Sequence, residues 1–208
     1  MTVVKICGLT CVEDALHAAE AGADLIGLIF YPQSPRAVQP ETAAEIVSAV
    51  KRVYPSVRCV GVFVKPSVEL VRGVMSQVGL DAAQLHAAPV EVIQALEGRA
   101  YPAIKVWDEV AQQAARLPQA TLPQVLLDAN HPTLWGGSGE RADESLAQQI
   151  AANHRLLLAG GLTPENVAEV VARVRPWGVD VASGVELAPG RKDPLRVRQF
   201  VRQAKAER

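Results

Sequence analysis

The feature that most constrains the fold is a repeated alternation of short apolar runs with longer amphipathic segments. The apolar runs read as strands at residues 3–6, 24–30, 57–64, 81–86, 102–107, 123–129, 155–161 and 179–184. Most are continuously apolar, as expected for parallel strands that are covered on both faces. Eight strand–helix units in 208 residues predict a closed (β/α)8 barrel, a TIM barrel, with residues 1–208 as a single domain.

Start and stop signals separate these units. Thr10 and Glu13 have the spacing of a capping box, which predicts a helix that begins after Thr10. Asp193 directly before Pro194 predicts a second helix start. The pattern G-x-D recurs at residues 22–24, 79–81 and 178–180. Each copy is interpreted as the end of a helix, a turn and the start of a new strand.

A doubly wound open sheet is the alternative fold. Such a sheet usually has fewer strands and, when it binds a dinucleotide, carries G-x-G-x-x-G after its first strand. Here the first predicted turn reads CGLT, residues 7–10. A partial match at residues 137–142 does not follow a predicted strand. The barrel is therefore the favoured prediction.

Charge and cysteine content exclude several classes of function. The net charge of −1 gives no electrostatic basis for binding nucleic acid or an anionic membrane. No apolar run approaches the roughly 20 residues of a membrane span, and the N-terminus enters a strand without a signal segment. Cys7, Cys11 and Cys59 are too few for a disulfide framework and lack zinc-site spacing. We expect a cytoplasmic protein with no metal, membrane or nucleic-acid partner.

Polar residues stand where most of the predicted strands end. In strand order they are Cys7, Arg36, His86, Asp128, the pair Gly160 and Gly161, and the pair Ser183 and Gly184. Barrels of this type place their chemistry in the loops that follow the strands. We therefore expect these residues to converge on one mouth of the barrel.

The last two of these strand ends indicate a phosphate site. Backbone amides at Gly160, Gly161, Ser183 and Gly184 can approach an anion closely, and a helix N-terminus adds its dipole. Barrels often bind phosphate in the loops after strands seven and eight. The alternative is that these glycines only form tight turns. Arg36 has a planar fork that suits a carboxylate, although it could also be an ordinary exposed arginine.

Cys7 and Asp128 are the candidates for proton transfer. A strand-end cysteine is more often a small buried apolar residue, which is the alternative for Cys7. An aspartate after Val-Leu-Leu needs more explanation, because an unpaired carboxylate beside apolar groups is costly. A positive ligand site is expected to favour the Cys7 thiolate. A base and an acid across one mouth indicate an isomerase-type site. His86 could contact a ligand, pack structurally or act as a base.

The motifs together resemble the phosphoribosylanthranilate isomerase family of tryptophan biosynthesis. In order they are VKICGLT (4–10), FYPQSPR (30–36), VGVFV (60–64), QLH (84–86), LLDA (126–129), GGSG (136–139), AGGLTPENV (159–167), VDVASGVE (179–186) and PGRKD (189–193). The similarity covers nearly the whole chain. The similar isomerase of histidine biosynthesis looks like a two-aspartate enzyme, with aspartate at the position of Cys7.

The resemblance implies an Amadori rearrangement of N-(5-phosphoribosyl)anthranilate without a metal or cofactor. It implies that Asp128 is the general acid and Cys7 the general base. It further implies that Arg36 holds the anthranilate carboxylate and that amides around Gly161, Ser183 and Gly184 hold the phosphate. His86 carries over as a residue near the ligand. Similar proteins occur as monomers and as homodimers, and either state is compatible with the sequence.

Two other functions remain open at this stage. An aldolase on the same barrel would need an inward-facing lysine, and Lys5 or Lys105 could serve. A non-catalytic phosphate-ligand barrel would need no acid–base pair. Strand alternation gives Lys5 the inward direction of Cys7, and barrel closure places the first strand beside the eighth. We therefore predict that Lys5 pairs with Asp180 inside the barrel, because an unpaired buried lysine is costly.

Overall fold

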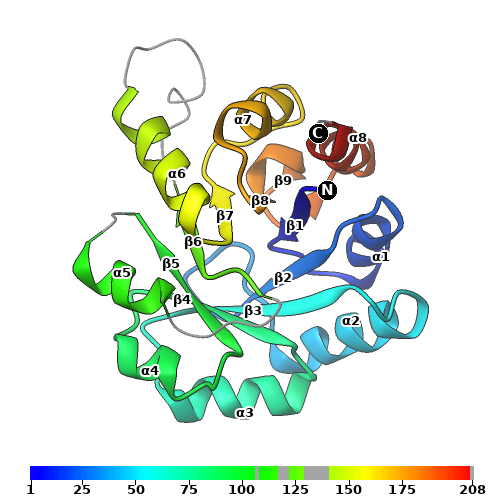
Figure 1. The fold of residues 1–208 in the computed structure, drawn as a ribbon. Coiled ribbons are helices and arrows are strands. Elements are labelled where there is room, and N and C mark those ends of the chain that lie inside the picture. The colour runs from blue at the N-terminus through cyan, green and yellow to red at the C-terminus, as the bar shows by residue number, and fades with distance from the viewer. Residues whose placement is uncertain (106–107, 117–121, 129–140, 207–208) are drawn as a thin grey trace.

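In the computed structural model, eight parallel strands form a closed barrel with helices around its outside (Figure 1). The structure describes residues 1–105, 108–116, 122–128 and 141–206. The strands follow one another in chain order around the barrel, and β8 closes it by pairing with β1. The predicted (β/α)8 barrel is confirmed.

All eight predicted strands are present, with ends that differ by a few residues. They are β1 (Val3–Cys7), β2 (Leu25–Ile29), β3 (Arg58–Val64), β4 (Ala82–His86), β5 (Ala100–Ile104), β6 (Val125–Asp128), β7 (Leu156–Ala159) and β8 (Gly178–Val181). Strand β5 begins two residues before the predicted start at 102, and residues 106–107 of that prediction lie outside the described part.

The helices cover the outer face of the barrel. They are α1 (Val12–Glu20), α2 (Pro40–Val53), α3 (Val68–Val78), α4 (Val90–Gln94), α5 (Glu109–Ala115), α6 (Arg141–Asn153), α7 (Val167–Val174) and α8 (Pro194–Ala206). A short 3₁₀ helix, η1 (Ser183–Val185), follows β8. No helix in the described ranges has the length and apolar content needed to cross a membrane.

Two apolar clusters stabilise the barrel. The larger lies between the outer face of the strands and the helices. The smaller fills the barrel interior and includes Leu25, Val60, Tyr101, Leu126 and Leu157. Because side chains alternate along a strand, the strands β2 to β7 each contribute to both clusters. Burial of this apolar surface is the main force that holds the helices on the barrel.

The predicted capping box at the first helix is wrong. Cys11 is the N-cap of α1 and makes no side-chain capping bond. The Thr10 hydroxyl donates instead to the carbonyl oxygen of Gly190, at 2.6 Å. A partner from the far end of the chain has replaced the local one. The second predicted start is confirmed, because the Asp193 carboxylate accepts from the backbone N–H of Leu195 at 2.9 Å.

The G-x-D pattern serves two different purposes. Asp24 and Asp81 each accept a hydrogen bond from the backbone of the preceding strand, at Val4 (2.8 Å) and Cys59 (2.7 Å). The third copy does not follow this arrangement, because its glycine already lies inside β8. There the preceding helix, α7, ends at Val174 with Arg175 as its C-cap, before the pattern begins. The predicted equivalence of the three copies is therefore wrong.

A small antiparallel hairpin after η1 has no counterpart in the prediction. It consists of β9 (Glu186–Ala188) and β10 (Arg191–Lys192), with Lys192 opposite Glu186. Strands of three and two residues are too short to produce a periodic sequence signal. This hairpin lies in the loop that joins β8 to α8, at the functional end of such a barrel.

Candidate active site

The carboxyl ends of the strands surround a cavity of about 790 Å³. All eight candidate residues line it: Cys7, Arg36, His86, Asp128, Gly160, Gly161, Ser183 and Gly184. They come from six different strand ends, separated by up to about 180 residues in the chain. The fold therefore brings together in one cavity the residues that the sequence placed at strand ends.

Cys7 ends β1 and is 5% exposed. It stands opposite Gly27 of β2, where an added Cβ would lie 2.6 Å from the Cys7 Sγ. Only glycine at that position leaves room for the thiol. Burial raises the pKa of Cys7, and the nearby Lys5 ammonium lowers it by a smaller amount. The nearby positive charge therefore favours the thiolate as expected, but burial outweighs it in the ligand-free site.

Lys5 lies behind Cys7, fully buried inside the barrel. Its Nζ donates to Gln84 Oε1 at 2.9 Å and to Asp180 Oδ1 at 3.1 Å, which confirms the predicted Lys5–Asp180 pair. Burial is the largest single influence on the pKa of Lys5 and acts to lower it, but Asp180, Cys7 and Tyr101 together outweigh burial and the pKa is raised. For Asp180, burial raises the pKa and Lys5 opposes this. We assign ammonium and carboxylate, because the pKa of Lys5 is raised and opposite charges 3.1 Å apart stabilise each other.

The same hydrogen-bond network determines the tautomer and the charge of the His86 ring. Gln84 Oε1 accepts from Lys5 and, at 3.3 Å, from the Tyr101 hydroxyl. The amide nitrogen of Gln84 therefore faces His86 and lies 3.0 Å from its Nε2. Because an amide nitrogen only donates, Nε2 accepts and the ring proton is assigned to Nδ1. Burial, and then Lys5, lower the pKa of His86 to about 4, so the ring is neutral.

Asp128 ends β6 and lies across the mouth from Cys7. Strand β6 is three positions from β1 around the closed barrel. The Asp128 side chain is partly exposed to the cavity, whereas the three residues before it are buried. A thiol and a carboxyl thus reach the cavity from different sides. A ligand between them could receive a proton from one and lose a proton to the other.

The loops after β7 and β8 meet at one side of the cavity. Gly160 and Gly161 have φ values of 95° and 64°. A Cβ on Gly184 would lie 1.9 Å from the Leu162 carbonyl oxygen, so the two loops touch through their backbones. The Asn166 side chain holds the first loop by donating to the Gly161 carbonyl oxygen at 3.0 Å. Closely packed backbone of this kind suits an anion such as phosphate.

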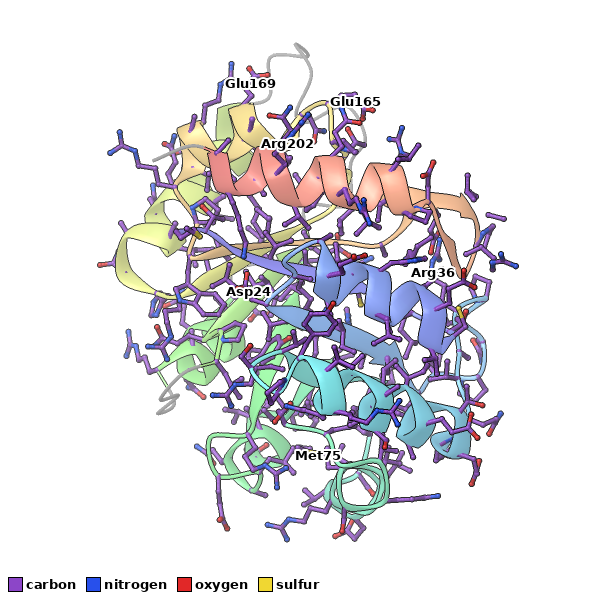
Figure 2. All side chains as sticks on the ribbon, turned by 90° about the vertical axis from the view of Figure 1, so that its right-hand side faces the viewer. Asp24, Arg36, Met75, Glu165, Glu169 and Arg202 are labelled. Carbon is purple, nitrogen blue, oxygen red and sulfur yellow. The ribbon has the colours of Figure 1, made fainter. Side chains whose placement is uncertain are left out.

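Arg36 lines the cavity from the loop between β2 and α2. Its guanidinium is paired with Glu186 through Nε–Oε1 (2.8 Å) and Nη2–Oε2 (2.6 Å). Figure 2 shows Arg36 at the right of the molecule, well apart from Asp24, which precedes β2. Arg36 is therefore part of the cavity wall and already has a structural partner.

Several site residues were missed by sequence reasoning. Gln84 precedes His86 by two positions, so strand alternation could have identified it as inward-facing. Glu186 and Lys192 lie in motifs that were recognised, but their contacts join distant segments. The GGSG motif and residues 129–140 lie outside the described part. Within the described residues, no three His, Cys, Asp or Glu side chains gather as metal ligands would.

A closed barrel with a thiol and a carboxyl across its mouth, beside glycine-lined loops that suit an anion, is the arrangement of a barrel enzyme. The profile of the family described as N-(5'-phosphoribosyl)anthranilate (PRA) isomerase matches residues 4–203. The chain belongs to this family. The enzyme class is therefore an isomerase on a TIM barrel.

Individual relatives agree over the full length. N-(5'-phosphoribosyl)anthranilate isomerase of Geobacter sp. (strain M21) is 45% identical over 99% of this chain and 98% of its own length. A crystal structure of phosphoribosyl anthranilate isomerase with reduced 1-(o-carboxyphenylamino)-1-deoxyribulose 5-phosphate has a TM-score of 0.82 and 38% identity, covering 99% and 100% of the two chains. A structure of "mutually generated monomers" of the dimeric Thermotoga maritima enzyme has a TM-score of 0.82 and 37% identity, with the same coverage.

Proposed function

We propose that this chain converts N-(5'-phosphoribosyl)anthranilate to 1-(2-carboxyphenylamino)-1-deoxyribulose 5-phosphate, a step of tryptophan biosynthesis. One observation carries the proposal: Cys7 and Asp128 reach a single cavity from different sides, and the same cavity is lined by glycine-containing loops and by an arginine. The reaction needs one acid and one base, and it needs recognition of a phosphate and a carboxylate. The cavity offers a group for each requirement.

Asp128 is the general acid of the first step. It protonates the ribose ring oxygen, and the bond between that oxygen and C1 breaks. The lone pair of the anthranilate nitrogen forms the C1=N bond, which gives a protonated Schiff base. Asp128 stands at the strand end with its side chain partly exposed to the cavity, so a substrate oxygen can reach it. The carboxyl leaves this step as a carboxylate.

Cys7 is the general base of the second step. Its thiolate removes the C2 proton, and the C2–H electrons form the C1=C2 bond while the C=N electrons return to nitrogen. The resulting enolamine tautomerises to the ketone product. Burial raises the pKa of the thiol, and the Lys5 ammonium counteracts this. The positive Schiff base formed in the first step makes the C2 proton more acidic. Each positioned acid or base contributes about 10²- to 10⁴-fold.

The remaining site residues bind the substrate. Backbone amides of Gly160, Gly161, Ser183 and Gly184 hold the phosphate between the loops after β7 and β8. Arg36 binds the anthranilate carboxylate through its charged fork. His86 is a neutral ligand contact, because its lowered pKa makes it a poor base. No step of this scheme requires a metal or cofactor.

One relative and the cysteines also bear on the oligomeric state and the compartment of the enzyme. The Thermotoga maritima relative is described as dimeric, so we propose a homodimer or a monomer for this chain. All three cysteines are free thiols, which agrees with a reducing cytoplasm as the working compartment.

Loss of anthranilate fluorescence tests the function. Phosphoribosylanthranilate is generated in situ and mixed with the parent protein, Cys7→Ala or Asp128→Ala. The parent should turn over, and each variant should lose about 10²- to 10⁴-fold in kcat. Cys11→Ala is the matched control, because this thiol is outside the cavity lining and its loss should leave kcat unchanged. A folded parent without turnover would contradict the proposal.

The aldolase alternative is disfavoured by the state of its lysines. A Schiff-base lysine must present a neutral amine. Lys5 is instead an ammonium held by two acceptors, and Lys105 is exposed and is not among the residues that line the cavity. Borohydride reduction of the enzyme–substrate mixture should therefore give no covalent adduct on either lysine. The alternative of a non-catalytic barrel would show ligand binding without turnover in the fluorescence assay.

A further inference from the structure

The Arg36–Glu186 contact involves one edge of the guanidinium. Nε and Nη2 each donate one hydrogen to the Glu186 carboxylate, at 2.8 and 2.6 Å. A guanidinium has five N–H donors in a planar fork, so three remain on Nη1 and Nη2. Glu186 is the hydrogen-bond partner of this guanidinium within the described residues. Arg36 can therefore be fixed along one edge and still bind a carboxylate with the other.

A second cation completes the cluster. Lys192 Nζ donates to Glu186 Oε1 at 2.7 Å and to the Ala182 carbonyl oxygen at 3.1 Å. Its side chain is 1% exposed, and that of Glu186 is 5% exposed. Burial would raise the pKa of Glu186, but the hydrogen bonds from Arg36 and Lys192 outweigh it and lower the pKa. Glu186 is thus a buried carboxylate between two cations.

The charge balance shows why two cations are useful. An isolated Arg36–Glu186 pair is neutral and would attract a ligand carboxylate only weakly. With Lys192 the three side chains carry one net positive charge. Lys192 and Glu186 are buried. Coulomb attraction is stronger where water is excluded, so this one net charge matters for binding an anion. Lys192 therefore allows Glu186 to orient Arg36 without cancelling its attraction for an anion.

The hairpin that carries this pair is tied to the start of the chain. Lys192 stands opposite Glu186 in the β9–β10 register. The Lys192 backbone N–H donates to Asp14 Oδ2 of α1 at 2.8 Å, and the Thr10 hydroxyl holds the hairpin turn at Gly190. The loops after β1, β2 and β8 are thereby joined around the cluster. Arg36 is held in a constant place relative to the end of β1.

We infer that Glu186 and Lys192 are positioning residues that hold Arg36 for recognition of the substrate carboxylate. The inference rests on the proposed function, in which Arg36 binds the anthranilate carboxyl group. Neither residue is required to touch the reacting atoms. Their loss should therefore weaken recognition of the carboxylate more than it slows proton transfer.

The test compares two ligands that differ only in the carboxylate. One is reduced 1-(o-carboxyphenylamino)-1-deoxyribulose 5-phosphate, and the other is the same compound with an unsubstituted phenyl ring. Dissociation constants are measured by calorimetry for the parent, Glu186→Gln, Lys192→Met and Arg36→Met. We expect each variant to bind the carboxylated ligand at least about tenfold more weakly, because the charged hydrogen bond from Arg36 is either removed or misplaced. Each variant should bind the phenyl ligand nearly as the parent does.

A double variant distinguishes a positioning role of Glu186 from direct contact with the ligand. In Arg36→Met, adding Glu186→Gln should cause little further loss, because the oriented group is already gone. With phosphoribosylanthranilate, Glu186→Gln should raise KM more than it lowers kcat. Glu186→Asp, which keeps the charge, should recover part of the affinity. If Glu186→Gln does not fold, as judged by circular dichroism, Lys192→Met takes its place in the ligand comparison and in the double variant with Arg36→Met.

A matched control and the contrary outcomes complete the design. Glu20→Gln breaks an exposed pair with Arg198 and should change neither affinity. Equal weakening of both ligands, or full additivity with Arg36→Met, would overturn the positioning role. Arg36→Met that binds both ligands like the parent would overturn the assigned role of Arg36 as well. Absence of turnover by the parent would instead contradict the proposed reaction and would not bear on the positioning role.

Discussion

Lys5 and Asp180 form an ion pair inside the barrel, with 3.1 Å between Nζ and Oδ1. They occupy paired register positions on β1 and β8, the two strands that close the barrel. Lys5 is fully buried, so water cannot replace a lost partner. Its charge is compensated by Asp180 and further satisfied by Gln84. The pair thus joins the first and last strands at the floor of the active-site cavity.

We predict that Asp180→Asn is strongly destabilising. It leaves the Lys5 ammonium buried without a counter-charge, which typically costs about 3–5 kcal/mol. Urea unfolding measures the loss in the free energy of unfolding. The double variant Lys5→Met/Asp180→Leu should be less destabilised than Asp180→Asn, because it removes both charges. Glu20→Gln, in an exposed pair, should cost less than about 1 kcal/mol. An equal cost for Asp180→Asn and Glu20→Gln would contradict the prediction.

The Cys7 thiol should titrate above its ordinary value of about 9 in the ligand-free protein. Burial disfavours the thiolate, and Lys5 only partly compensates. The rate of alkylation of Cys7 by iodoacetamide should therefore still be rising above pH 9. Lys5→Met should move the curve to higher pH, because it removes the nearest positive charge. A midpoint below pH 9, or a shift to lower pH in Lys5→Met, would be inconsistent with this account.

This measurement needs a background in which only Cys7 reacts. Cys11→Ser and Cys59→Ser together provide it. Cys59 is a weak competitor in any case, since burial raises its pKa to about 12. The same double substitution without Lys5→Met is the control for the effect of the lysine.

Much of the barrel and its mouth could be predicted because the signals are local. Continuous apolar runs mark parallel strands, and the residue after each run must lie at a strand end. The Lys5–Asp180 pair followed from two rules, strand alternation and barrel closure. These rules require no knowledge of individual side-chain positions, so they are reliable at the level of the sequence.

The remaining contacts depend on tertiary structure. Thr10 has a local capping partner in the sequence, yet its hydroxyl bonds to Gly190. Arg36 looked free to bind a ligand, yet it pairs with Glu186, 150 positions away. Which distant residues become partners depends on how the loops pack. No rule of sequence spacing predicts that packing. The sequence indicated the effect of positive charge on Cys7, but the extent of burial, which outweighs that charge, depends on the packing around the strand end.

His86 should make the protein less stable in acid. Its pKa is about 4 in the folded chain and about 6.5 ordinarily, so the unfolded chain binds more protons between these values. The stability that neutral His86 contributes is present above pH 6.5 and is lost as pH falls towards 4. Urea unfolding at pH 7.5 and 5 should show this loss, and His86→Gln should reduce it. An NMR titration of the His86 ring with a midpoint near 6.5 would rule this out.

Gly184→Ala should damage the proposed phosphate site by separating two loops. The added Cβ would lie 1.9 Å from the Leu162 carbonyl oxygen, so the backbone after β7 or β8 must move. Overpacking of this kind costs about 1–3 kcal/mol, and inorganic phosphate should inhibit turnover less well in the variant. Gly73→Ala in α3 is the matched control. A Cβ there meets no atom within 4 Å, and alanine favours a helix over glycine by about 1 kcal/mol. The control should therefore gain stability and keep the parental inhibition constant. If Gly184→Ala also kept that constant, the phosphate would have to bind elsewhere in the cavity.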